Sequence, residues 1–199
     1  MIIAACDPGS NGAFIAMDKN GNTLYQFVFK NNKDGEFDIK YFSDNVKDFL
    51  QKYSNNSIIF YIEDVHSLFG MSAKSNFSFG KNCGMIEASI ITLGYEVYKV
   101  TPKDWQKEML KGIEVIKKIK KEKYKEYDPD TFEQVEKIRL VETKKNDVKA
   151  MSLKAQEKHF PDFNSRASDR CKMPHDGLVD ALLIAEYARR THKNTRDEA

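Results

Sequence analysis

The sequence predicts an α/β fold, because apolar strands and amphipathic helices alternate along most of the chain. Two continuous apolar runs have the character of buried strands, and each ends in an acid, Asp7 in the first and Glu63 in the second. The last amphipathic helix, residues 175–190, carries Asp176 and Asp180 on one face. Two buried strands therefore each end in a carboxylate, and the last helix carries two more.

The first strand runs directly into turn residues. The chain begins MIIAACDPGSNGAFIAMD, in which Asp7 follows an apolar run. Asp-Pro-Gly at this point favours a turn. Asn11-Gly12 favours a hairpin into a second strand at 13–17, and a third strand follows at 23–29. A further interpretation is that Asp7 binds a metal, because hard divalent cations prefer oxygen ligands; it requires partner acids elsewhere in the chain.

The middle of the chain continues the alternation. Apolar residues at helical spacing predict a helix over 38–53, and a continuous apolar run predicts a strand over 58–62. A long helix is expected from about 73 to 93, followed by a strand at 95–100. Thr101-Pro102 then marks the start of another helix, with Thr as N-cap and Pro at the first helical position.

Small residues recur on one face of the long helix, at Gly80, Gly84 and Ala88. Glycine inside a helix costs about 1 kcal/mol relative to alanine. The spacing therefore indicates a close backbone contact, made either with the sheet or with a second copy of the chain.

Residues 112–146 are the least regular part of the sequence, and we interpret them as a lysine-rich insertion or linker. Three isoleucines give a weak helical stripe over 113–119, and Asp128-Pro129 interrupts it. Residues 132–141 are compatible with a second helix, and residues 147–160 form a clearer amphipathic helix.

The composition is that of a soluble globular protein, because 41% of the 199 residues are apolar, 31% are charged and the formal net charge is +2. The length fits a single domain over residues 1–199. No run approaches the roughly 20 apolar residues of a membrane helix. Three cysteines, an odd number without Cys-x-x-Cys spacing, indicate free thiols in a reducing cytoplasm.

Charge is unevenly distributed along the chain. Residues 99–125 hold ten lysines and four acids, whereas residues 1–70 hold six lysines and nine acids. A basic segment beside an acidic half fits a nuclease, which must attract phosphate near a carboxylate site. The alternative for the lysine run is a solvated helix face.

Asp180 is the most informative acid of the last helix. The helix dipole explains an acid at the position of Asp176. Asp180 instead precedes the apolar stretch ALLIA, so we expect it to be partly buried. A buried carboxylate needs a hydrogen-bond partner or a cation.

Six motifs occur in order along the chain, DPGSNGA at 7–13, IEDV at 62–65, FGKNCGMIEA at 79–88, TPKDWQKEM at 101–109, KAMSLKAQEKHFPD at 149–162 and HDGLVDALLIAEYARR at 175–190. Together they resemble the RuvC-like Holliday-junction resolvases of phages and bacteria, within the ribonuclease H-like superfamily. The resemblance covers most of the chain.

The resemblance implies a mixed five-stranded sheet flanked by helices, a homodimer, and a magnesium-dependent endonuclease. Its substrate would be branched DNA, either four-way junctions or forks and flaps, resolved by paired nicks. The implied location is the cytoplasm, that of the host if the chain is phage-encoded, with no membrane partner. Two Mg²⁺ ions, replaceable by Mn²⁺, would bind four catalytic carboxylates, Asp7, Glu63, Asp176 and Asp180.

Candidate DNA contacts lie outside the carboxylates. Phe69, in the loop after Glu63, is a candidate wedge that stacks at the branch point, and the alternative is an aromatic ring packed on the core. Resemblance to the family implies phosphate contacts near Lys107 and Lys145. Bacterial relatives commonly space the last two acids three residues apart; the four-residue spacing here is similar to the mitochondrial branch and leaves open a metal contact by His175.

The residues also allow other classes of protein. A different ribonuclease H-like nuclease and a non-catalytic module that binds branched DNA are two of them. A sugar-kinase or actin-like phosphotransferase also has a first strand ending in Asp-x-Gly, but it requires two such domains. A zinc site at Cys171 and His175 lacks further ligands at suitable spacing.

Overall fold

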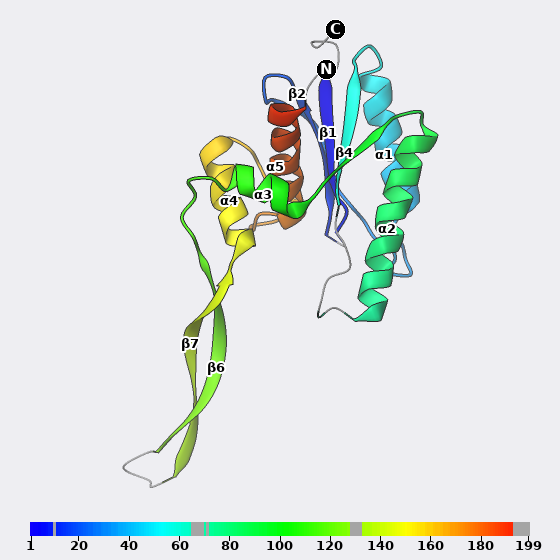
Figure 1. The fold of residues 1–199 in the computed structure, drawn as a ribbon. Helices are drawn as coiled ribbons and strands as arrows, with labels where there is room; N and C mark the ends of the chain where they lie inside the picture. Colours follow the sequence, from blue (N-terminus) through cyan, green and yellow to red (C-terminus); the bar gives the residue numbers. More distant parts are fainter. Residues whose placement is uncertain (10, 65–69, 71, 128–132, 193–199) are drawn as a thin grey trace.

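A mixed five-stranded sheet with the order β3-β2-β1-β4-β5 is the centre of the fold (Figure 1). It is seen in a computed structural model that describes residues 1–9, 11–64, 70, 72–127 and 133–192. The strands are β1 (Ile2–Asp7), β2 (Ala13–Asp18), β3 (Thr23–Val28), β4 (Ile58–Glu63) and β5 (Val97–Val100). β1 pairs antiparallel with β2 and parallel with β4, which confirms the expected mixed sheet.

Two turns reverse the chain between the first three strands. The Gly12 N–H donates to the Gly9 carbonyl (2.9 Å) between β1 and β2. Between β2 and β3, the Asp18 carboxylate accepts the backbone N–H groups of Asn20 (2.8 Å) and Asn22 (2.9 Å). The hairpin interpretation of these residues is therefore confirmed, and it leaves β1 between β2 and β4 in the sheet.

Helices cover both faces of the sheet (Figure 1). α1 (Ile39–Lys52) and α2 (Ala73–Thr92) cover one face. The other face carries α5 (Asp176–Thr191), with α3 (Pro102–Met109) and α4 (Val148–His159) beside it. These helices confirm the helices expected outside residues 112–146.

Side chains of β1 alternate between the two layers of the core. Ile3 and Ala5 belong to the cluster that contains the buried residues of α5. Ile2 and Ala4 belong to the cluster that contains those of α1 and α2. The same alternation places the side chain of Asp7, two residues beyond Ala5, on the face that α5 covers.

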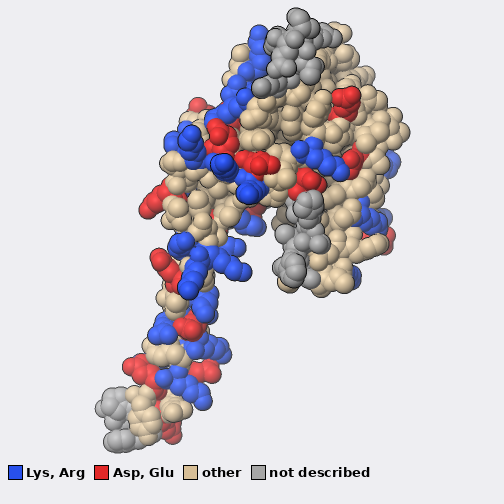
Figure 2. Space-filling model, viewed as in Figure 1, with Lys and Arg blue, Asp and Glu red and all other residues tan. Residues whose placement is uncertain are grey.

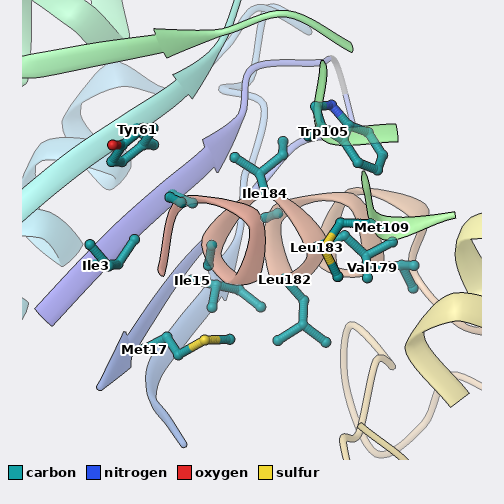
Figure 3. Packing of buried hydrophobic residues seen from close by; sticks show 14 of the residues in the cluster. Ile3, Ile15, Met17, Tyr61, Trp105, Met109, Val179, Leu182, Leu183 and Ile184 are labelled. Atoms are coloured by element: carbon teal, nitrogen blue, oxygen red, sulfur yellow. The ribbon is translucent and has the colours of Figure 1, made fainter. Parts of the chain in front are cut away.

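The apolar side of α5 fixes this helix on the sheet (Figure 3). Leu182, Leu183 and Ile184 are completely buried and pack in the same cluster as Ile3 and Ile15 of the sheet. Burying side chains of this size contributes roughly 1.5–3 kcal/mol each. The acids at the start of α5 are therefore carried by a well-anchored element.

The helices expected within residues 112–146 were wrong. In place of a helical stripe over 113–119 and a helix over 132–141, the chain forms two long antiparallel strands, β6 (Lys117–Tyr127) and β7 (Gln134–Asn146). The hairpin projects from the body as an arm (Figure 1). Its strands are held by pairs of opposite charge across the ladder, which stabilise an antiparallel pair: Lys123–Glu136, Lys137–Glu126 and Arg139–Glu122.

The glycines of α2 do not pack against the sheet. A Cβ atom built on Gly80 or Gly84 would meet no atom of the described residues within 4 Å. Of the two contacts considered for this helix face, the contact with the sheet is therefore wrong, and contact with a second copy stays a prediction.

Two further sequence expectations concern cysteines and membranes. Cys6, Cys83 and Cys171 are all free thiols, as expected. No helix in the described part of the chain is long and apolar enough to cross a membrane.

Candidate active site

Asp7 and Glu63 stand at the same edge of the sheet, at the ends of neighbouring parallel strands. The register pairs Cys6 with Ile62, so the two acids are the next residues on β1 and β4. Tyr61 belongs to the cluster on the α5 side of the sheet. Because side chains alternate along a strand, Glu63 points to that side as well, as Asp7 does.

Neighbouring N–H groups orient both strand-end carboxylates. The Gly9 backbone N–H donates to Asp7 Oδ1 (2.9 Å). The indole N–H of Trp105, a buried residue of α3, donates to Glu63 Oε1 (2.7 Å). Each acid therefore keeps one oxygen hydrogen-bonded within the protein and has a second oxygen for another partner.

Gly177 lets the start of α5 pack against the turn that follows β1, and Gly12 lets that turn close tightly. A Cβ on Gly177 would lie 2.1 Å from the Asn11 carbonyl oxygen and 3.0 Å from the Gly12 backbone. A Cβ on Gly12 would lie 2.1 Å from the Asp7 carbonyl oxygen. Only residues without a side chain allow the two backbones to approach this closely. The contact brings Asp176, the residue before Gly177, beside Asp7.

His175 serves as the N-cap of α5. Its Nδ1 accepts the Leu178 N–H (3.3 Å), and burial lowers the pKa of the ring. The nitrogen that accepts this bond is thereby occupied within the helix. This arrangement gives no support to a metal contact by His175, which the sequence left open.

The carboxylates raise one another's pKa values. Burial, followed by the charge of Glu63, raises the pKa of Asp7 to about 7. Burial, together with the charge of Asp180, raises the pKa of Glu63 to about 7, and burial with the charge of Asp7 does the same for Asp180. The charge of Asp176 raises the pKa of Asp7 as well. Residues from β1, β4 and α5 thus form one electrostatically coupled acidic cluster.

Lys149 of α4 is the cation that contacts this cluster. Its ammonium group forms an ion pair with Asp176, which raises the pKa of Lys149. Its charge in turn lowers the pKa of Asp7 and of Asp180. The motif that begins at Lys149 contributes to the family resemblance, but the sequence alone gives Lys149 no role. Nothing local in the sequence indicates that α4 lies beside α5.

A cavity of about 240 Å³ opens between α4 and α5 at the acids. Its lining includes Lys149, Ser152, Asp176 and Asp180. Ser152 Oγ is buried and lacks a hydrogen-bond partner within the described residues, although its proximity lowers the pKa of Asp180. The cavity thus places the Ser152 hydroxyl beside the buried Asp180, close enough to lower the pKa of its carboxyl.

The donor chemistry of the cluster fits a hard divalent cation. All four acids supply oxygen, the ligand type of Mg²⁺ and Mn²⁺, and three of them are held where ionisation is unfavourable without a positive charge. As the side chains stand, no three His, Cys, Asp or Glu residues within the described ranges lie close enough to share one ion. The acids therefore fit a metal by type and electrostatics, whereas their present positions do not form a closed ligand shell.

The predicted DNA-contact residues are more dispersed. Lys107 is exposed on the last turn of α3, and Lys145 is exposed near the base of the β6–β7 hairpin. Phe69 lies outside the described residues.

Solved structures with this fold are known. The RuvC structure of Thermus thermophilus matches with a TM-score of 0.55 and 15% identity, covering 96% of this chain and 96% of its own. The same protein in complex with a Holliday junction substrate matches with a TM-score of 0.53, 15% identity and the same coverage. No protein-family model and no curated protein sequence matches the chain. The chain therefore has a RuvC-like fold of the ribonuclease H-like type, and the resemblance of its motifs is confirmed at the level of the fold.

Gly177→Ala tests whether the backbone contact builds the site. The new Cβ would overlap the backbone of the Asn11-Gly12 turn, which cannot move as a flexible side chain could. We expect the free energy of unfolding in urea to fall by about 1–3 kcal/mol. Gly80→Ala is the matched control, because its new Cβ would meet no atom of the described residues within 4 Å. The substitution also removes a glycine from a helix interior, so it should raise the free energy of unfolding by roughly 0.5–1 kcal/mol. Equal effects of the two substitutions would contradict the contact.

The raised carboxylate pKa values predict that the acidic cluster destabilises the metal-free protein at neutral pH. Between about pH 4, where these groups ionise in the unfolded chain, and the folded value of about 7, the folded state binds more protons. Stability conferred by the protonated cluster is therefore lost as the pH rises through this window. Asp180→Asn should melt at a higher temperature than the wild type in chelator at pH 8, and the difference should shrink towards pH 4. A difference independent of pH would show that Asp180 is not the group responsible.

Proposed function

We propose that this protein is a metal-dependent endonuclease that nicks branched DNA, with the four-way junction as its main substrate. The observation that carries the proposal is the convergence of acids from β1, β4 and α5 on one face of a RuvC-like sheet. The complex of the Thermus thermophilus RuvC with a Holliday junction substrate supports the choice of substrate class.

Two Mg²⁺ ions, replaceable by Mn²⁺, are the proposed cofactors. The residues that would hold them are Asp7, Glu63, Asp176 and Asp180. Bound ions would supply a water activated for attack on phosphorus and charge that stabilises the leaving oxygen. The raised pKa values of the acids favour the arrival of positive charge, because a cation offsets the repulsion that the protein alone leaves in place.

The chain's own groups prepare this site. The Gly9 N–H and the Trp105 indole hold the carboxylates of Asp7 and Glu63 in fixed orientations, as outer hydrogen bonds do around metal ligands. Lys149 holds Asp176 and adds a positive charge at the cavity where a phosphate would enter. We propose that metal binding would release Lys149 from this carboxylate and that its ammonium group would then contact the scissile phosphate when DNA is bound.

Basic side chains lie beside the acids on the face shown in Figure 2. Figure 2 shows Lys and Arg side chains beside the acidic patch of the body and along the projecting hairpin. Lys107 and Lys145 are exposed and remain the proposed phosphate contacts. Such contacts position the nucleic acid without reading its sequence.

A homodimer is proposed because two symmetric nicks require two sites. On α2, Phe77 is 75% exposed and Ile91 is 55% exposed. Gly80, Gly84 and Ala88 lie between them at helical spacing, so the five residues form one stripe. A stripe of small residues flanked by exposed apolar side chains suits close packing with the same helix of a second copy.

Asp7→Asn should abolish nicking while binding persists. The substitution keeps the size of the side chain but removes a charge that metal binding requires. The measurement is nicking of an end-labelled synthetic four-way junction in Mg²⁺, with binding of the same junction in chelator.

Asp64→Asn is the control for this experiment. Asp64 is also an acid at the end of β4, but alternation places its side chain opposite to that of Glu63. The Asp64→Asn variant should therefore nick normally.

Near-normal nicking by Asp7→Asn would overturn the metal-site assignment. A wild type that binds junctions but never nicks them would identify a non-catalytic binding module, and nicking without preference for branches would indicate another ribonuclease H-like nuclease.

Gly84→Leu should weaken dimerisation by about tenfold to a hundredfold, because overpacking a close contact costs about 1–3 kcal/mol. Gly84→Ala is the graded control and should leave the dimer intact. Sedimentation velocity over a concentration series measures both. A monomeric wild type, or a dimer unaffected by leucine, would exclude this face as the interface.

A further inference from the structure

The two faces of the β6–β7 hairpin differ in chemistry. In an antiparallel pair, residues directly opposite each other project to the same face. The register therefore divides the hairpin into two sets. We call the face that contains Ile119, Lys121, Lys123, Lys125, Ile138 and Leu140 the open face, and the face that contains Lys120, Glu122, Tyr124, Glu126, Lys137 and Arg139 the paired face.

Charges on the paired face are satisfied within the hairpin. Glu122 accepts two hydrogen bonds from the Arg139 guanidinium (3.0 and 2.9 Å). That guanidinium also lies over the ring of Tyr124, 5.4 Å from its centre. Glu126 pairs with Lys137 at 2.7 Å. This face needs no external partner.

The open face is left with exposed apolar and charged groups. Ile119 and Ile138 are each 62% exposed, and Leu140 is 68% exposed. Lys123 pairs with Glu136, but within the described residues no ion pair joins Lys121 or Lys125. Glu142 is the second acid of this face. Adjoining apolar side chains and unpaired lysines on a projecting ribbon indicate an interaction surface.

The charge of the hairpin favours a polyanion as its partner. β6 and β7 together hold ten Lys or Arg residues and four Glu residues, an excess of six positive charges. The whole chain carries a formal charge of only +2, so the remainder carries four excess negative charges. Figure 2 shows the basic side chains distributed along the length of the hairpin rather than at one point. An extended, evenly spaced array of phosphates matches this distribution.

The base of the hairpin is joined to the acidic cluster. The Asp147 N–H donates to the Ile116 carbonyl (2.7 Å), and Lys117 Nζ donates to Asn146 Oδ1 (2.7 Å), which closes the two strands at their base. α4 begins at Val148, directly after Asp147, and Lys149 in the first turn of this helix contacts Asp176. A nucleic acid held by the hairpin is therefore held beside the site.

The dimensions of the hairpin fit a DNA duplex. The 11 residues of β6 span about 36 Å at roughly 3.3 Å per residue. One turn of B-DNA is about 34–36 Å long, and its major groove admits a two-stranded ribbon.

We propose that the open face of the β6–β7 hairpin docks on a duplex arm of the branched DNA, over about one helical turn beyond the site of cleavage. Lys121 and Lys125 contact backbone phosphates, and Ile138 and Leu140 contact the apolar surface of the groove. The inference rests on the proposed function for its substrate class, and it adds a separate duplex-binding surface outside the carboxylate site.

Paired substitutions of the full-length protein test the choice of face. Lys121→Gln/Lys125→Gln removes two charges from the open face, and Lys120→Gln/Lys137→Gln removes two from the paired face. Binding to a long-armed four-way junction is measured in chelator against salt concentration. The open-face variant should lose about 2 units of the log–log slope, whereas the paired-face variant should keep the slope nearly unchanged. Equal losses in the two variants would overturn the proposal.

A second substrate separates this inference from the proposed function. Junctions whose hairpin-capped arms are about 6 base pairs long are too short for a contact that spans a helical turn of about 10 base pairs. Wild type and open-face variant should nick them equally in Mg²⁺, and only the wild type should bind long-armed junctions more tightly than short-armed ones. Failure of the wild type to nick either substrate counts against the proposed function, whereas a wild type without preference for long arms overturns duplex docking. A shift of the open-face variant from dimer to monomer in sedimentation, with DNA binding unchanged, would also overturn it.

Discussion

The backbone contact between Gly177 and the turn at Asn11-Gly12 is the constraint on which the candidate site depends. β1 carries Asp7 to the edge of the sheet, but the acids of α5 reach it only because the start of this helix lies against the turn without an intervening side chain. The apolar side of α5, buried on the sheet, then fixes the helix along its length. A substitution that moved the start of α5 by even an ångström would separate the acids while leaving most of the core intact.

This packing concentrates negative charge in a place where the protein does not fully compensate it. Burial and mutual repulsion raise the pKa values of Asp7, Glu63 and Asp180 to about 7, and Lys149 and the Trp105 indole offset only part of the effect. A cluster selected for stability alone would replace these acids with neutral residues. We propose that their presence reflects a cation that binds there, because its positive charge would offset the repulsion among the acids.

The elements that carry strong local signals could be predicted from the sequence. The strand that ends in Asp7, the strand that ends in Glu63 and the helix that carries Asp180 were identified because burial leaves continuous apolar runs, and the acids interrupt those runs. The hairpin at 117–146 was missed because alternating lysines and glutamates suit an exposed helix as well as an exposed strand. Its pairing depends on partners such as Glu122 and Arg139 that are distant in sequence. Lys149, Ser152 and Trp105 were not assigned roles for the same reason, since only tertiary packing brings them to the acids.

In the proposed function, the carboxylate cluster and the β6–β7 hairpin have different roles. The carboxylate cluster is small and acidic, and the hairpin is extended and basic, so one would suit chemistry at a single phosphate and the other would suit contacts with many. Closure of the ligand shell would then accompany binding, with Lys149 moving from Asp176 as metal enters.

The central claim is that the four acids form a metal site, and anomalous diffraction from a crystal soaked in Mn²⁺ tests it most directly. The account predicts anomalous peaks within the cluster formed by Asp7, Glu63, Asp176 and Asp180, with Lys149 displaced from Asp176, and no peaks in Asp7→Asn crystals. A protein that cleaves junctions in Mn²⁺ but shows no Mn²⁺ at these residues, or shows it bound elsewhere, would contradict the account.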